Sequence, residues 1–176
     1  MSATIAGAEG AERMTLNVKV NGTARAIDVE PRDTLLDTLR DKLNLTGAKK
    51  GCEEAVCGSC AVLLNGRAVC SCMMFAVEAE GSEIVTIEGL SDGQVLNPIQ
   101  KQFIEKDGAQ CGFCTSGQII ASKSFLDHIA TGPGDRIDDE IREAMSGNVC
   151  RCGSYNGIFD AIREVLLQRR QGGQVL

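Results

Sequence analysis

The chain has 176 residues, a formal net charge of −6, nine cysteines, 3% aromatic residues and no Trp. That length suits one medium domain or two small ones. The acidic balance and the lack of a Lys/Arg run argue against nucleic acid as a partner, and no apolar run approaches the roughly 20 residues of a membrane span.

Strand and turn signals open the chain. Residues 1–13 are expected to form a disordered tail that does not have the pattern of a signal peptide. Residues 14–20 alternate apolar and polar side chains, which predicts a half-buried strand. Asn21–Gly22 follows as a tight-turn signal, and residues 26–29 supply a return strand, so the start of the fold is a hairpin.

One helix and a second hairpin are expected next. Thr34 is placed to cap a helix that runs to Leu43, with Leu35, Leu36, Leu39 and Leu43 on one face. After a glycine-bearing loop, residues 61–69 form a second hairpin around Asn65–Gly66, and residues 84–87 form a last strand. The pattern predicts a small α+β unit over residues 14–90.

The second half of the chain changes to helical periodicity. Gly and Pro interrupt it at residues 132–134, and no repeat of fixed period is present. The predicted helices cover residues 97–106, 115–129 and 137–145, with a fourth marked by residues 158–166 that ends before Gly172. We therefore expect a compact four-helix unit over residues 91–170, followed by a tail over 171–176.

Nine cysteines without a secretion signal indicate metal binding in a reducing, cytoplasmic compartment, where disulfides are disfavoured. Cys52, Cys57 and Cys60 have the C-x4-C-x2-C spacing of plant-type [2Fe–2S] ferredoxins, followed by a distant fourth cysteine. Gly51 and Gly58 are expected to adopt left-handed turns that let backbone N–H groups reach the sulfurs. A zinc knuckle fits three cysteines in nine positions poorly.

Spacing alone leaves the fourth ligand of this first group open. Cys70 and Cys72 lie two residues apart, so on a strand they would share one face. Either thiol could complete the group.

A second group combines Cys111-x2-Cys114 with Cys150-x-Cys152, and each pair precedes a predicted helix. Two helix N-termini offer free N–H groups and partial positive charge to a negative cluster. Taken alone, four thiolates here could also hold zinc. Beside the first group, a second [2Fe–2S] cluster is favoured.

Three segments carry a resemblance to a known family: GCEEAVCGSC at 51–60, QCGFCTSGQ at 110–118 and CRC at 150–152. They resemble the small iron–sulfur subunit of the molybdenum hydroxylases, the family of xanthine dehydrogenase, aldehyde oxidoreductase and carbon monoxide dehydrogenase. The resemblance covers about residues 14–168. It implies an N-terminal β-grasp ferredoxin domain followed by an all-α four-helix [2Fe–2S]-binding domain.

The resemblance also implies a function. A large partner subunit would bind molybdopterin, usually as the cytosine dinucleotide in bacteria, and oxidise the substrate with oxygen from water. Electrons would pass through the helical-domain cluster and then the ferredoxin-domain cluster, usually to FAD on a third subunit. An aldehyde is the expected substrate, with an N-heterocycle, xanthine or carbon monoxide as alternatives. No catalytic residue is expected on this chain.

Site residues follow from the same resemblance. The family's Ser-Cys dipeptide after the second hairpin corresponds to Ser71–Cys72, which favours Cys72 over Cys70. Gln110 is expected to touch the pterin cofactor, with Cys152 the cluster ligand nearest to it. The implied metal ligands are Cys52, Cys57, Cys60, Cys72, Cys111, Cys114, Cys150 and Cys152.

The chain departs from the family at positions that are not ligands. Many members have Gly where Ala55 sits, Pro where Ser116 sits, and Thr-Gly where this chain has Gly153–Ser154. The last variation resembles bacterial members that oxidise aldehydes and N-heterocycles. Cluster binding is therefore expected to be kept.

Two alternative functions share part of this sequence pattern, and His128 and Arg151 are the other residues that stand out. A freely diffusing ferredoxin would have no obligate partner, which the second cluster motif argues against. A zinc-structured interaction module is the alternative from another class of protein. His128 is expected to be a surface or packing residue, and Arg151 could either lend charge to the cluster or form a salt bridge to a partner.

Overall fold

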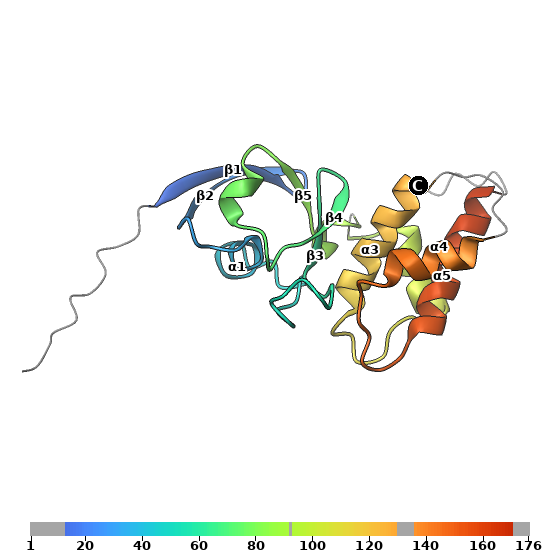
Figure 1. Ribbon diagram of the computed structural model, residues 1–176. Coiled ribbons are helices and arrows are strands. Elements are labelled where there is room, and N and C mark those ends of the chain that lie inside the picture. The colour runs from blue at the N-terminus through green and yellow to red at the C-terminus, as the bar shows by residue number, and fades with distance from the viewer. Residues whose placement is uncertain (1–12, 92, 130–135, 171–176) are drawn as a thin grey trace, which may run out of the picture.

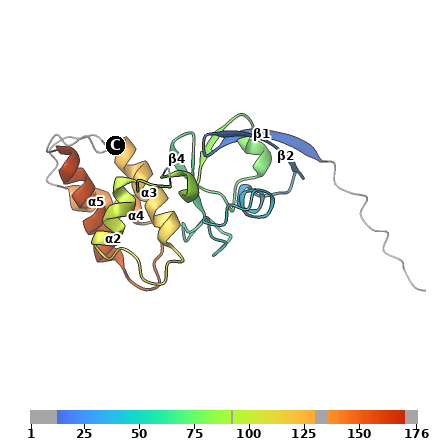
Figure 2. The same ribbon diagram turned by 180° about the vertical axis from the view of Figure 1, so that it is seen from behind.

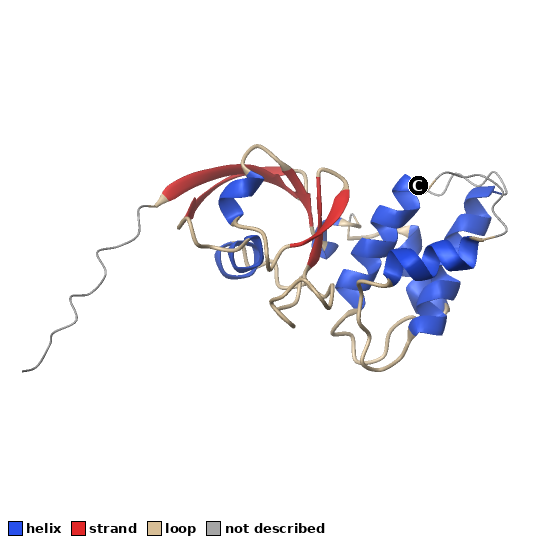
Figure 3. Cartoon of the chain, in the orientation of Figure 1, coloured by secondary structure: helices blue, strands red, loops and turns tan. Residues whose placement is uncertain are grey.

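The computed structural model describes residues 13–91, 93–129 and 136–170. Residues 1–12 and 171–176 of the expected tails, and the break at 132–134, lie outside the described residues. The first half forms a five-stranded sheet of order β2-β1-β5-β3-β4, in which β1 and β5 are parallel and the other pairs antiparallel (Figures 1 and 3). The strands are β1 (Met14–Val20), β2 (Thr23–Val29), β3 (Ala61–Leu64), β4 (Arg67–Cys70) and β5 (Glu83–Val85).

This strand order, with a helix packed on one face, is the β-grasp arrangement, and the predicted fold class is confirmed. Leu16, Val18 and Val20 of β1 are buried, as the alternation predicts. The last strand is shorter than predicted: it ends at Val85, and a 3-10 helix follows at η3 (Ile87–Gly89). A second 3-10 helix, η2 (Ala76–Ala79), was not expected from the sequence.

The helix on the sheet begins where predicted but has a different form. The Thr34 side chain accepts the N–H of Asp37 and caps α1 (Leu35–Asp37). The chain then continues as the π-helix η1 (Thr38–Lys42), in which the Leu43 N–H bonds to the carbonyl five residues back. The expectation of one regular α-helix to Leu43 is therefore wrong, although Leu35, Leu36 and Leu39 are buried on one face as predicted.

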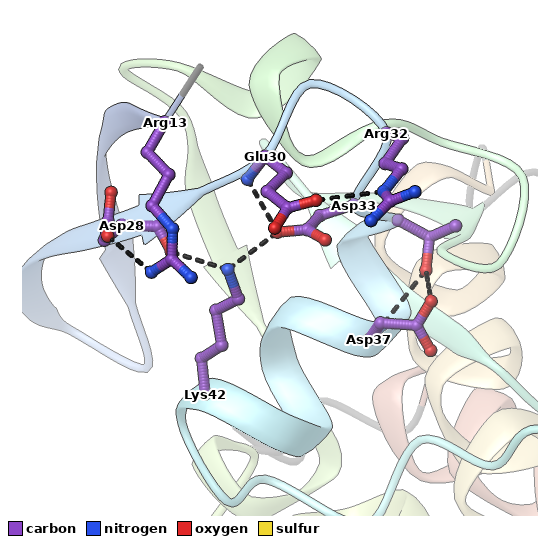
Figure 4. A network of polar contacts seen from close by, with 8 residues as sticks. Arg13, Asp28, Glu30, Arg32, Asp33, Asp37 and Lys42 are labelled. Carbon is purple, nitrogen blue, oxygen red and sulfur yellow. Dashed lines mark hydrogen bonds and ion pairs between the residues drawn. The ribbon is translucent and has the colours of Figure 1, made fainter. Parts of the chain in front are cut away.

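An ammonium group ties the end of this helix to the end of β2 (Figure 4). The Lys42 Nζ donates to the Asp28 carbonyl and to the Asp33 carboxylate, each at 2.6 Å. Partial burial acts to raise the pKa of Asp33, but hydrogen bonds from Lys42 and from the Glu30 N–H outweigh it, so that pKa lies below its usual value.

The second half contains the four predicted helices. They are α2 (Pro98–Glu105), α3 (Thr115–His128), α4 (Ile137–Met145) and α5 (Tyr155–Arg170). Asn97 caps α2 with Pro98 at its start, as expected. The shared core of the four helices includes Ile99, Phe103, Leu126, Ile141, Met145, Ile158 and Ile162. No helix in the described ranges is long and apolar enough to cross a bilayer.

Helix α3 belongs to both halves of the molecule, and both views place it between the sheet and the other helices (Figures 1 and 2). Its Ile120 is buried with Ala61 and Leu63 of β3. Its Ser124 hydroxyl accepts the Ala68 N–H of β4 at 3.0 Å. The predicted boundary at residues 90 and 91 stays a prediction.

Candidate metal centres

The first cysteine loop runs between η1 and β3 and turns through left-handed residues. Glu53, Ala55 and Gly58 have φ of +57°, +56° and +68°. The expectation was right for Gly58 but wrong for Gly51, whose φ is not positive. Ala55 takes the strained turn instead, which gives a physical reason for the Gly that many family members have there.

Backbone N–H groups point at the sulfurs of this loop. Cys52 Sγ accepts the N–H groups of Glu54 and Cys57, both at 3.4 Å. These donors lower the pKa of Cys52 to about 7. Cys60 is deeper, with 2% of its surface exposed, and contact with the Cys70 thiol together with burial raises its pKa. The loop backbone therefore stabilises the thiolate of Cys52, whereas the Cys70 contact and burial favour the neutral thiol of Cys60.

Cys70 and Cys72 both reach Cys60 but differ in their surroundings. Cys72 is 7% exposed and its sulfur accepts the Ala55 N–H, while burial raises its pKa to about 11. Cys70 is half-buried at the end of β4, with its sulfur 3.8 Å from the Ala55 carbonyl. The hydroxyl of Ser71, the residue between Cys70 and Cys72, donates to the Cys60 carbonyl at 2.6 Å and so links this turn to Cys60.

The second cysteine group forms where α3 and α5 begin. Cys114 is the N-cap residue of α3, and Cys150 is buried before α5. Cys150 Sγ accepts the Ser154 N–H at 3.4 Å, and its own N–H donates to the Tyr155 hydroxyl at 2.8 Å. Burial and the Cys150 thiol raise the pKa of Cys114 to about 11. Cys111, whose pKa is lowered by the Phe113 N–H, is exposed, as is Cys152.

Within each cysteine group the thiols contact one another, which is compatible with a two-iron cluster. No three His, Cys, Asp or Glu side chains in the described part of the chain are grouped to hold a single metal ion. A [2Fe–2S] cluster instead takes two thiolates on each iron. The thiol contacts are Cys52 with Cys57, Cys60 with both Cys70 and Cys72, Cys111 with Cys152, and Cys114 with Cys150.

The two centres are directly connected. The Val149 N–H donates to the Cys57 carbonyl at 3.0 Å, so the residue before Cys150 touches a cysteine of the first loop. Phe113 lies against Gly51 across the same junction. Val56, Phe113 and Val149 are 61%, 48% and 47% exposed, and we call these three side chains the apolar rim.

The structure places three further candidate residues at the surface: Gln110, Arg151 and His128. Gln110 is exposed beside Cys111, and Arg151 is exposed between its two cysteines. His128 is exposed with Nδ1 2.7 Å from the Ser124 carbonyl, as expected of a surface residue. Sequence reasoning missed Asn148 and Tyr155, because a buried amide and a phenol beside a cysteine carry no spacing signal.

Two protein families match the chain in succession. The family described as "2Fe-2S iron-sulfur cluster binding domain" matches residues 18–91, and that described as "[2Fe-2S] binding domain" matches residues 86–163. The chain is 49% identical over 164 residues to the aldehyde oxidoreductase iron–sulfur-binding subunit PaoA of Escherichia coli, covering 87% of this chain and 72% of that protein. It is 44% identical over 151 residues to the nicotinate dehydrogenase small FeS subunit of Eubacterium barkeri, covering 86% and 94%.

Solved structures agree with these relatives. A chain of quinoline 2-oxidoreductase from Pseudomonas putida 86 superposes with a TM-score of 0.81 at 43% identity, covering 93% of this chain and 99% of that one. The aldehyde oxidoreductase of Desulfovibrio gigas superposes with a TM-score of 0.82 at 34% identity, covering 90% of this chain but 17% of that longer one.

Proposed function

This chain belongs to the family of small [2Fe–2S] iron–sulfur subunits of the molybdenum hydroxylases, and we propose that it carries electrons from a molybdopterin centre on a large partner subunit to an acceptor subunit. The observation that carries the proposal is the pair of four-cysteine groups joined by the Val149–Cys57 hydrogen bond. Substrate chemistry belongs to the partner's cofactor.

Eight of the nine cysteines would hold the two clusters. The first cluster would be held by Cys52, Cys57, Cys60 and Cys72, and the second by Cys111, Cys114, Cys150 and Cys152. When bound, each cluster supplies a carrier for one electron at a time. The chain's own contribution is to hold thiolates in place, to donate N–H groups to sulfur and to limit the access of water.

Exposure of the second centre suggests the direction of transfer. Cys111, Cys152 and Gln110 lie at the surface, whereas Cys150 is buried and connects through Val149 to the first loop. The helical-domain cluster would therefore receive electrons first, with Gln110 and Cys152 against the pterin. The apolar rim offers the partner subunit a desolvated contact around both loops.

Substrate and partners are inferred from the relatives. The similarity to PaoA supports an aldehyde as substrate, and the similarity to nicotinate and quinoline enzymes keeps an N-heterocycle as the alternative. We further propose molybdopterin as the cytosine dinucleotide on the large subunit, FAD on a third subunit and a cytoplasmic location, where thiols stay reduced.

Metal analysis and electron paramagnetic resonance (EPR) of the purified complex test the proposal. The complex should contain about four irons per copy of this chain and show two distinct signals after reduction. Cys52→Ser and Cys111→Ser should each remove one signal, a different one in each variant, and stop turnover. Zinc in place of iron, or both signals surviving either substitution, contradicts the proposal.

A further inference from the structure

Gly58 of the first cysteine loop lies tightly against both α3 and the segment before Cys150. A Cβ placed on Gly117, in the first turn of α3, would lie 2.2 Å from the Gly58 carbonyl oxygen and 2.9 Å from Ser59 Cα. A Cβ on Gly58 would lie 2.4 Å from Asn148 Nδ2 and 2.7 Å from the Gly147 carbonyl oxygen. Backbone therefore touches backbone at the junction, and neither contact has room for a methyl group.

Asn148 closes the junction from the other side. It is 7% exposed, and its Nδ2 lies 3.4 Å from the Gly58 carbonyl to which it donates. Its own carbonyl accepts Gln118 Nε2 of α3 at 3.2 Å. One buried amide residue thus contacts both the first loop and α3, and it stands two positions before Cys150.

Other contacts also attach the helical half to the first half of the chain. The Ser116 hydroxyl donates to the Gly47 carbonyl at 2.6 Å, and the Ser124 hydroxyl accepts the Ala68 N–H. Ile120 also packs against β3. The glycine junction is distinguished by its position, because each of its residues lies within three positions of a proposed cluster ligand in the chain.

We infer that the Gly58–Gly117 contact, closed by Asn148, is a positioning device that sets the separation of the two clusters and hence their electronic coupling. The inference rests on the proposed function. Ordinary van der Waals contact begins near 3.4 Å, so a methyl group 2.2 Å from a backbone oxygen requires the loops to part by about 1.2 Å (3.4 − 2.2). Backbone on both sides leaves no flexible side chain to absorb that shift.

Gly117→Ala in the purified complex tests the inference, with Gly147→Ala as the matched control. Ala is the better helix former, so α3 should still fold. Gly147 lies beside Asn148, and a Cβ there meets no atom within 4 Å. The readout is the magnetic splitting between the two reduced clusters in low-temperature EPR, which depends steeply on their separation.

With about four irons per chain retained, Gly117→Ala should reduce the splitting and slow electron transfer between the clusters severalfold. Reduction of the helical-domain cluster by substrate, which precedes that step, should keep its rate, and Gly147→Ala should match the wild type in all respects. Asn148→Ala should change the splitting in the same direction. If Gly117→Ala does not load clusters, the splitting measured in Asn148→Ala is the deciding test of the inference.

A wild-type splitting in a fully loaded Gly117→Ala variant overturns the inference, as does a wild-type splitting in Asn148→Ala when Gly117→Ala stays unloaded. Either result leaves the proposed function standing, because both clusters are then present. A wild-type complex without iron instead refutes the proposed function.

Discussion

Exchanging Cys70 and Cys72 separately for serine distinguishes a cluster ligand from a bystander thiol. Cys72 is buried and accepts the Ala55 N–H, as a coordinating sulfur would. Cys72→Ser should remove the ferredoxin-type cluster. The complex should then lose about two of its roughly four irons per chain and one of its two EPR signals. The other cluster, held by the helical half, should keep its signal unchanged.

Cys70→Ser should keep both clusters. Its sulfur is half-buried and 3.8 Å from the Ala55 carbonyl, a long and weak contact that a hydroxyl can replace. We expect the free energy of unfolding to change by less than about 1 kcal/mol. Iron and acid-labile sulfide per chain, with EPR of the reduced complexes, measure both variants side by side.

The opposite pattern refutes the reasoning. If Cys70→Ser loses the ferredoxin-type signal while Cys72→Ser keeps it, the fourth ligand is Cys70, and burial with N–H donation was the wrong criterion. If each single variant keeps the cluster and only the double variant loses it, either thiol can serve as the ligand.

Four further predictions concern stability. Tyr155→Phe keeps the ring but removes the acceptor of the Cys150 N–H, so denaturant unfolding should show a loss of about 1 kcal/mol; an unchanged midpoint contradicts this. Ala55→Gly should relieve the left-handed turn and raise the free energy of unfolding by up to about 1 kcal/mol, whereas a loss would show no strain there. Lys42→Met should cost about 0.5 kcal/mol at neutral pH. Because the pKa of Asp33 is lowered in the folded protein, this contribution is complete above its unfolded pKa of about 4 and is lost as the pH falls through the folded value; an equal difference in strong acid contradicts the assignment. Anaerobic removal of iron by a chelator should lower the melting temperature by several degrees, and an unchanged melting curve would show that the clusters do not stabilise the fold.

Much of the fold could be predicted from short segments, because the responsible forces are local. Asn21–Gly22 and Asn65–Gly66 all adopt positive φ, as a tight hairpin turn requires. Thr34 caps its helix through a hydrogen bond to the backbone only three residues away. Cysteine spacing likewise predicted the cluster chemistry, since the length of chain between thiols limits which of them can meet.

Other features depend on segments far apart in the chain, and only the tertiary structure decided them. The leucine pattern predicted a regular α-helix, whereas the segment that packs against the sheet ends as the π-helix η1. In the first cysteine loop the left-handed positions are Glu53, Ala55 and Gly58, whereas Gly51 is not left-handed. The contact of Gly58 with Gly117 joins residues from different halves of the molecule. Local sequence patterns encode turns, caps and faces, whereas a distance between two halves arises only when both are packed.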